Sequence, residues 1–202
     1  TSKDVTDPIM SVKNVVSQTG NVGITSEDGI LVGKEDTSET QKDGFTGNVK
    51  AAKDVSIAAA KDVTLDGTVA SGAANTVTLK STIGALTQID IENTSKAITA
   101  QKLVTVSNKG QDLQDKGNSF RQFNFSGSTD NTINGNVTIY DTANPDLTLD
   151  GNDSKVDGEV TITNTVAGSN LIVNTGFETL NSHPINLTAD GALINNSTSI
   201  LK

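Results

Sequence analysis

Short strand-like motifs recur along this chain of 202 residues at a nearly constant interval, and that interval restricts the fold more than any other feature. Each motif places one polar residue between two aliphatic residues. Val137-Thr138-Ile139 recurs as Val160-Thr161-Ile162 after 23 residues, and Val160 recurs as Ile185 after 25 residues. Leu147-Thr148-Leu149 recurs as Leu171-Ile172-Val173 after 24 residues. Strands that recur at almost one interval indicate a coil in which each strand stacks on its own copy one turn later.

Alternation within the motifs predicts strands and not helices. A period of two residues puts both aliphatic side chains on one face and the central residue on the other. Val, Ile and Thr favour such a half-buried pleated surface, and the Gly, Asn and Asp residues around the motifs supply turns. The motifs are Val55-Ser56-Ile57, Val63-Thr64-Leu65, Val77-Thr78-Leu79, Ile89-Asp90-Ile91, Val104-Thr105-Val106, Val137-Thr138-Ile139, Leu147-Thr148-Leu149, Val160-Thr161-Ile162 and Ile185-Asn186-Leu187.

The repeat interval predicts an all-β parallel β-helix, a solenoid of roughly eight to ten coils, each of about 20–25 residues. A single coil cannot bury its inward aliphatic side chains, so its neighbours above and below must cover them. The alternative is an antiparallel sandwich or barrel built from hairpins, for which Asn134-Gly135 is a turn signal. One turn dipeptide does not outweigh the repeated interval, so we favour the solenoid.

Composition excludes several classes of protein. The chain has no Cys, which rules out disulfide scaffolds, zinc ribbons and thiol nucleophiles. The formal net charge is −9 and Arg121 is the single arginine, so a nucleic-acid partner is not expected. No apolar run approaches the roughly 20 residues that a membrane helix needs, and no transmembrane segment is expected. The start of the sequence lacks the basic and apolar regions of a signal peptide.

Three polar stretches interrupt the rhythm of the motifs and are expected to be extruded loops. They span residues 34–44, 108–118 and 151–158. Solenoids tolerate such insertions and place them on one face, often the contact face. Apart from these loops, we interpret residues 1–202 as a single β-helical segment of a longer protein.

The motifs between Gly47 and Gln88 resemble the repeats of filamentous-haemagglutinin-like exoproteins, the large adhesins of two-partner secretion systems. The residues that carry the resemblance are Asp54-Val55-Ser56-Ile57-Ala58-Ala59, Asp62-Val63-Thr64-Leu65-Asp66-Gly67 and Val77-Thr78-Leu79-Lys80-Ser81. A second recurrent pattern of that family is similar to Gly117-Asn118-Ser119-Phe120, Gly135-Asn136-Val137-Thr138-Ile139 and Asp146-Leu147-Thr148-Leu149. Together these motifs cover residues 47–190.

The resemblance implies a right-handed β-helical shaft that is secreted or held at the surface of a Gram-negative bacterium. It also implies adhesion to a host-cell or bacterial receptor or glycan, and export through an outer-membrane secretion partner. The export motifs of the family's N-terminal secretion domain do not occur in this sequence. An autotransporter passenger therefore stays open as an alternative route of export.

Candidate binding residues are few. Phe120, Phe123 and Phe125 form an aromatic cluster that could either stack sugars on the surface or pack inside the column, and packing is the preferred interpretation. His183, the single histidine, precedes Pro184 at the start of a strand, and no motif supplies it with catalytic partners. We interpret it as an exposed turn residue.

The run from Asp150 to Glu159 is rich in oxygen ligands and raises the possibility of a calcium loop. Its candidate ligands are Asp150, Asn152, Asp153 and Asp157. The run lacks the glycine and glutamate spacing of an EF-hand, and the nonapeptide calcium repeat is absent. A solvated turn is therefore the preferred interpretation, and no metal or cofactor is expected.

These observations predict a non-enzymatic shaft segment of a large secreted adhesin. Polysaccharide lyases and tailspike glycosidases share the β-helix, but they place several carboxylates on one face, whereas Asp90 is the one plain outward carboxylate in these motifs. A toxin of the same exoprotein family is the other alternative, and no sequence feature separates it from an adhesin.

Overall fold

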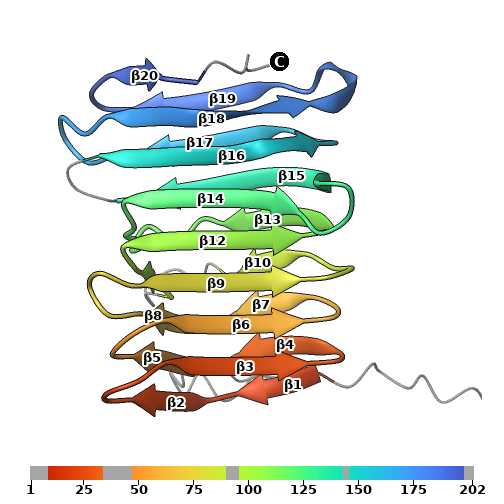
Figure 1. The fold of residues 1–202 in the computed structure, drawn as a ribbon, viewed down its shortest axis with the longest axis vertical. Helices are drawn as coiled ribbons and strands as arrows, with labels where there is room; N and C mark the ends of the chain where they lie inside the picture. Colours follow the sequence, from red (N-terminus) through yellow and green to blue (C-terminus); the bar gives the residue numbers. More distant parts are fainter. Residues whose placement is uncertain (1–8, 34–46, 90–95, 143–145, 198–202) are drawn as a thin grey trace, which may run out of the picture.

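The computed structural model describes residues 9–33, 47–89, 96–142 and 146–197, which form an all-β parallel solenoid of about seven turns with essentially no helix. Figure 1 shows the strands stacked like rungs along the longest axis. All pairings between strands in these residues are parallel. The solenoid prediction is confirmed, and the antiparallel sandwich is excluded.

The number of turns is lower than the eight to ten expected, because one turn is unusually long. Ile30 pairs with Val63 and Val22 pairs with Val55, an interval of 33 residues in both cases. That turn contains residues 34–46, which lie outside the described part, as does the loop expected at 34–44. The longer interval uses more of the chain for one turn, so fewer turns fit into 202 residues.

Two long ladders of strands run the length of the solenoid. Face 1 consists of β1 (Ile9–Val12), β4 (Gly29–Val32), β7 (Val63–Leu65), β10 (Leu86–Gln88), β13 (Lys109–Leu113), β15 (Thr132–Asp141), β17 (Val160–Asn164) and β19 (Ile185–Ala189). Face 3 consists of β3 (Val22–Ser26), β6 (Val55–Ala59), β9 (Thr76–Ser81), β12 (Lys102–Ser107), β14 (Gln122–Gly127), β16 (Leu147–Val156), β18 (Leu171–Thr179) and β20 (Leu193–Asn195).

The third side of the coil changes position along the axis. In the N-terminal half it is face 2, which connects face 1 to face 3 and consists of β2 (Asn14–Ser17), β5 (Gly47–Ala51), β8 (Gly67–Ala70) and β11 (Ile98–Thr99). Face 2 ends where Thr99 bridges to Ser119. In the C-terminal half the longer strands β15, β16 and β18 add a short side at the opposite corner, where Lys155 pairs with both Thr132 and Glu178.

The registers of the ladders match the sequence intervals. Val137 pairs with Val160, and Val160 pairs with Ile185. Leu147 pairs with Leu171. Inward residues of successive turns therefore form columns, and a continuous hydrophobic core runs through the described turns from Val12 to Phe177 and beyond. Each aliphatic side chain in a column is covered by its counterparts one turn above and below, as a solenoid requires.

One motif faces the opposite way from the prediction. Val104 and Val106 of β12 lie on the surface, whereas Leu103 and Thr105 are fully buried. A shift of one residue reverses the faces of a strand, and here the pairing of Thr105 with Phe125 in the next turn sets the register. The small Thr105 leaves room for the phenyl ring, and its hydroxyl donates a hydrogen bond of 2.6 Å to Gln111 Oε1.

Two segments expected to be extruded loops contain strands. Within 108–118, residues Lys109–Leu113 form β13, and the buried Gln111 is satisfied by Thr105 and by Ser107. Within 151–158, β16 continues to Val156 and turns a corner at Asn152 and Asp153, whose φ angles are 54° and 52°. Asn and Asp tolerate this left-handed backbone, so the polar run bends the strand instead of leaving the sheet.

Described buried side-chain polar atoms are hydrogen-bonded with one exception, Asn124 Oδ1 on the outer surface of β14. Asn124 lies between Val104 and Asp150 in the neighbouring turns. We expect Asn124→Val to raise the free energy of unfolding by about 1 kcal/mol, because it removes an unsatisfied acceptor and adds a β-branched contact to Val104. Chemical denaturation measures the change, with Gln122→Val on the same strand as the control. If Asn124→Val lowered the free energy of unfolding, Asn124 Oδ1 would not be an unsatisfied acceptor.

Candidate functional site

Outward polar side chains of face 1 form a continuous row along the solenoid axis. The pairings between adjacent strands place one outward residue of each turn beside the next. Successive strands in a sheet are about 4.8 Å apart, so the row repeats at that spacing. From β7 to β19 the row consists of Thr64, Thr87, Asp112, Thr138, Thr161 and Asn186.

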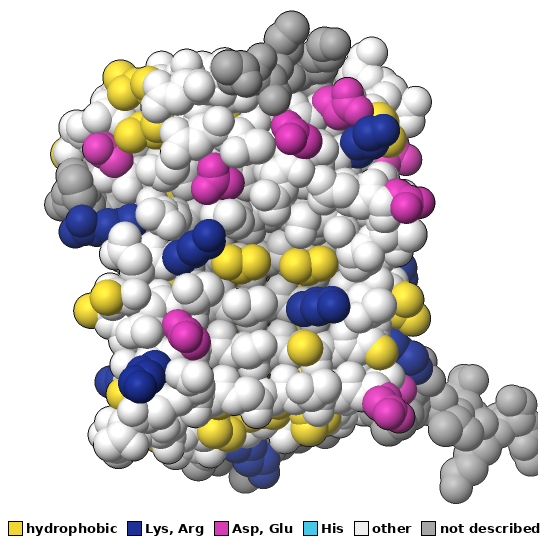
Figure 2. Space-filling model, in the orientation of Figure 1, with side chains coloured by type: hydrophobic (Ala, Val, Ile, Leu, Met, Phe, Trp, Pro, Cys, Tyr) yellow, Lys and Arg dark blue, Asp and Glu magenta, His cyan; other side chains and the backbone are white. Residues whose placement is uncertain are grey.

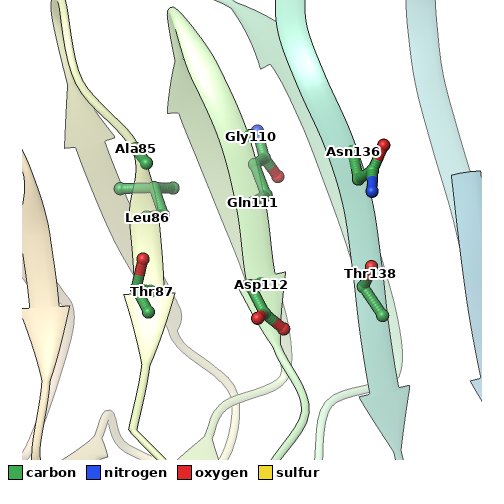
Figure 3. Close-up of a pocket in the computed structure, with 8 residues that line it drawn as sticks. All are labelled: Ala85, Leu86, Thr87, Gly110, Gln111, Asp112, Asn136 and Thr138. Atoms are coloured by element: carbon green, nitrogen blue, oxygen red, sulfur yellow. The ribbon is translucent and has the colours of Figure 1, made fainter. Parts of the chain in front are cut away.

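A shallow hollow of about 210 Å³ opens in the middle of this row. It crosses the start of β10 and the middle of β13 and β15, in three successive turns (Figure 3). Figure 3 shows the residues in two rows, Ala85, Gly110 and Asn136 in one and Thr87, Asp112 and Thr138 in the other. Leu86 and Gln111 complete the lining. Both have buried side chains, and the exposed lining combines hydroxyl, amide and carboxylate groups with apolar carbon surface in similar proportion.

A β-bulge and two glycines lie at the hollow. Lys109 pairs with Asn134 and Gln111 pairs with Val137, so β15 has one residue more than β13 across this point. Gly135, with φ of 152°, is inside the bulge and adopts a backbone conformation that L side chains rarely take. A Cβ atom on Gly110 would lie 2.8 Å from the Asn136 carbonyl oxygen. The two backbones therefore approach closely at the bulge, which leaves no room for a side chain on Gly110.

Some of the polar groups around the hollow form hydrogen bonds with other residues of the chain. The Glu159 N–H donates a hydrogen bond of 2.9 Å to Asn136 Oδ1, which fixes the amide and leaves its Nδ2 as a donor for solvent or a ligand. Gln114 Nε2 donates to an oxygen of Asp112 at 2.5 Å. Within the described turns, no hydrogen bond of the Thr87 or Thr138 side chain is present. The hollow thus offers two hydroxyls, an amide donor and carboxylate acceptors.

The three phenylalanines proposed as binding residues lie inside the column. Phe120, Phe123 and Phe125 are at most 1% exposed. Their rings stack in sequence, with centroids 5.9 Å apart between Phe120 and Phe123 and 5.5 Å apart between Phe123 and Phe125. Phe177 continues the stack with an edge-on contact at 5.2 Å from Phe125. The interpretation of these residues as an exposed sugar-stacking platform is therefore wrong. The preferred interpretation, packing inside the column, is confirmed.

The candidate calcium ligands occupy the corner of β16 and the turn that follows it. Asp150 Oδ1 accepts a hydrogen bond from the Thr175 hydroxyl at 3.3 Å, and Asp157 Oδ1 accepts one from Asn181 Nδ2 at 2.9 Å. Asn152 and Asp153 are the left-handed corner residues. Over the described ranges, no three His, Cys, Asp or Glu side chains come together in a way that could hold a metal ion.

His183 lies beside Asp157, with 3.7 Å between His183 Nε2 and Asp157 Oδ1. Both side chains are 42% exposed, and the distance is too long for a hydrogen bond. The His183 carbonyl accepts a hydrogen bond from the Thr179 hydroxyl at 2.6 Å. The pair is a solvated contact at the rim of the last turns, far along the chain from the hollow on face 1.

Charged groups are dispersed over the surface. Figure 2 shows the side formed by face 3, on which most Lys, Arg, Asp and Glu side chains are scattered and one basic side chain lies beside acidic ones near the upper right edge. The ion pairs on the surface are separate contacts, such as Lys61 with Asp28 at 3.2 Å and Lys155 with Glu178 at 3.9 Å. A further ion pair joins the buried Lys96 to the partly exposed Asp66.

Sequence reasoning missed the hollow, because residues 108–118 read as a loop. The signals that point to it are an isolated glycine in a strand, Gly110, and the Asn134-Gly135 dipeptide in the next turn. A lone glycine in a strand often marks a bulge or a close approach of two backbones. Neither signal reveals that the two glycines lie one turn apart, because that depends on the register.

Comparisons with known proteins identify no similar protein. No family model, no curated protein and no solved structure matches this chain. The described residues also form no helix of the length and apolar character needed to cross a membrane. The fold and the surface chemistry are therefore the basis for a functional proposal.

Proposed function

We propose that this chain is a non-enzymatic shaft segment of a large secreted bacterial adhesin, similar to filamentous-haemagglutinin-like exoproteins. The observation that carries the proposal is the uninterrupted parallel stack, with apolar columns inside and rows of Thr, Ser and Asn outside. Such a stack suits a spacer that holds contact surfaces away from a cell. Its outward rows suit attachment through many weak polar contacts.

The stiffness of the segment comes from the ladders. Hydrogen bonds between β-strands connect each turn to the turns above and below, on at least two faces of the coil. Hydrogen-bonded side chains add to these bonds at the corners, for example between Asn170 Nδ2 and Asp146 Oδ1 at 2.9 Å, one turn apart. Bending the rod would stretch both sets of contacts. The segment therefore resists bending and keeps its two ends at a fixed separation.

The fold also suits export through an outer-membrane partner, which we include in the proposal. In a solenoid each turn contacts only its neighbours, so folding can begin at one end and propagate. A chain that emerges progressively outside the cell can add each new turn to the previous one. The chain has no Cys and needs no disulfide chemistry during this process. These properties support a secreted or surface location in a Gram-negative bacterium.

Attachment of the purified chain to cells tests the proposal. We expect the labelled chain to bind host epithelial cells or bacterial cells saturably, without release of a dye trapped in those cells. An unfolded variant, Val160→Asp, serves as the control for non-specific adsorption. Absence of saturable binding to either kind of cell would contradict the adhesive role, and dye release would favour the toxin alternative.

A further inference from the structure

We propose that the hollow of face 1 binds a single residue of a neutral glycan, with Thr87, Asp112, Asn136 and Thr138 as its hydrogen-bonding groups. This inference rests on the proposed function and specifies the ligand class and the site of adhesion. The hollow is a point at which the outward row of face 1 becomes concave, and the backbone bulge between β13 and β15 runs beside it.

The size of the hollow limits its ligand. Its volume of about 210 Å³ is below the roughly 300–1,000 Å³ of pockets that bury a drug-sized molecule. The hollow is also open to solvent along the solenoid axis, where Thr64 and Thr161 continue the row on either side. A site of this shape accommodates one small ring and lets the rest of a chain leave along the surface.

Charge excludes an anionic ligand. Asp112 is the one charged side chain in the lining, and no Lys or Arg contributes to it. The chain carries a net charge of −9, so its field repels phosphates, sulfates and sialic acids. A divalent cation needs several oxygen ligands, typically from more than one carboxylate. A single carboxylate with two hydroxyls does not provide such a cage, so the favoured ligand is neutral.

Hydrogen-bonding capacity favours a ligand rich in hydroxyl groups. Asp112 offers acceptors, Asn136 Nδ2 is a donor, and the Thr87 and Thr138 hydroxyls can act as either. Vicinal hydroxyls of a sugar both donate and accept, so they match this mixture. An apolar ligand would leave these groups unpaired, which is costly. The Ala85 methyl group at the edge provides a small apolar contact for one face of a sugar ring.

A double variant tests the site without disturbing the fold. Thr87→Val/Thr138→Val removes both hydroxyls at constant shape, and Val is well accepted on a strand surface. The matched control is Thr78→Val/Thr148→Val, at outward half-buried positions of β9 and β16 on face 3. Asp112→Asn removes the charge and preserves the size of the side chain. Circular dichroism confirms that each variant retains its strand content.

The assay is saturation-transfer NMR of the full chain with neutral hexoses, N-acetylhexosamines and their short oligosaccharides, and with sialylated counterparts. We expect at least one neutral sugar to bind, sialylated forms to bind more weakly, and Thr87→Val/Thr138→Val to weaken binding by at least about tenfold, as the loss of two hydrogen bonds predicts. The face 3 control should bind like the unmodified chain. If the chain preferred sialylated sugars, or if both double variants bound sugars equally well, the proposal that a neutral glycan binds in the hollow would be wrong.

Cell attachment separates failure of the site from failure of the adhesive function. If cells bind the unmodified chain and Thr87→Val/Thr138→Val equally and no neutral sugar binds, the hollow is not a glycan site. The proposal of an adhesive function is then still supported. If a neutral sugar binds in the hollow but no cell binds the chain, the site stands and the adhesive role falls. If neither sugars nor cells bind, both proposals fall.

Discussion

Val160→Asp is expected to unfold several turns of the solenoid together and to remove most of its stability. Val160 is fully buried in β17, between Val137 of the preceding turn and Ile185 of the following turn. A carboxylate at this point lies in the apolar column and has no cation to pair with. Burying an unpaired charge costs several kcal/mol, and the whole stability of a typical domain is only about 5–15 kcal/mol.

The loss should extend beyond one turn because neighbouring turns stabilise each other. In a solenoid the interfaces between turns supply most of the free energy, so one broken interface exposes the columns on both sides. Urea denaturation followed by circular dichroism measures the effect. Thr163→Asp, an outward residue on the same strand, is the control and should change the free energy of unfolding by less than about 0.5 kcal/mol. If Val160→Asp retained the midpoint of the unmodified chain, the inward position of Val160 would be wrong.

The sequence was sufficient to predict the registers of the C-terminal half. Val137, Val160 and Ile185 begin similar motifs, and the structure pairs them in that order. The prediction succeeds because these inward positions hold aliphatic residues in several successive turns. Aliphatic residues therefore recur in the sequence at the interval of one turn. The predicted number of turns was too high because it assumed about 20–25 residues in every coil, whereas the interval from Val22 to Val55 is 33 residues.

The sequence was misleading where polar residues point inward. Thr105 and Gln111 are buried and hydrogen-bonded to each other, so their strands do not show the expected alternation. Thr105 pairs with Phe125 of the next turn, whereas Gln111 lies between Leu86 and Val137 and bonds to Thr105 and Ser107. Such pairing between turns depends on contacts distant in sequence, and a motif of three residues cannot reveal it. The hollow on face 1 escaped prediction for the same reason, because Gly110 and Gly135 meet only in the folded ladder.

A buried polar cluster at the corner after face 1 also escaped prediction, and Asn118 is its centre. Asn118 Oδ1 accepts hydrogen bonds from the Ile98 N–H at 2.8 Å and from Gln88 Nε2 at 3.0 Å. Its Nδ2 donates to Gln88 Oε1 at 2.9 Å and to the carbonyls of Leu113 and Tyr140 at 3.2 and 3.3 Å. One side chain thus connects backbone groups of three successive turns in the region where face 2 ends.

Asn118→Leu is expected to destabilise the chain by about 3 kcal/mol or more, although leucine has a similar volume and is apolar. The substitution leaves the buried Ile98 N–H without its acceptor and removes partners of Gln88, and each such loss costs about 1–3 kcal/mol. Equilibrium unfolding in urea measures the change, with the exposed Asn174→Leu on β18 as the matched control. A midpoint for Asn118→Leu equal to that of the control would show that apolar packing alone can close this corner and that the hydrogen-bonded cluster is dispensable.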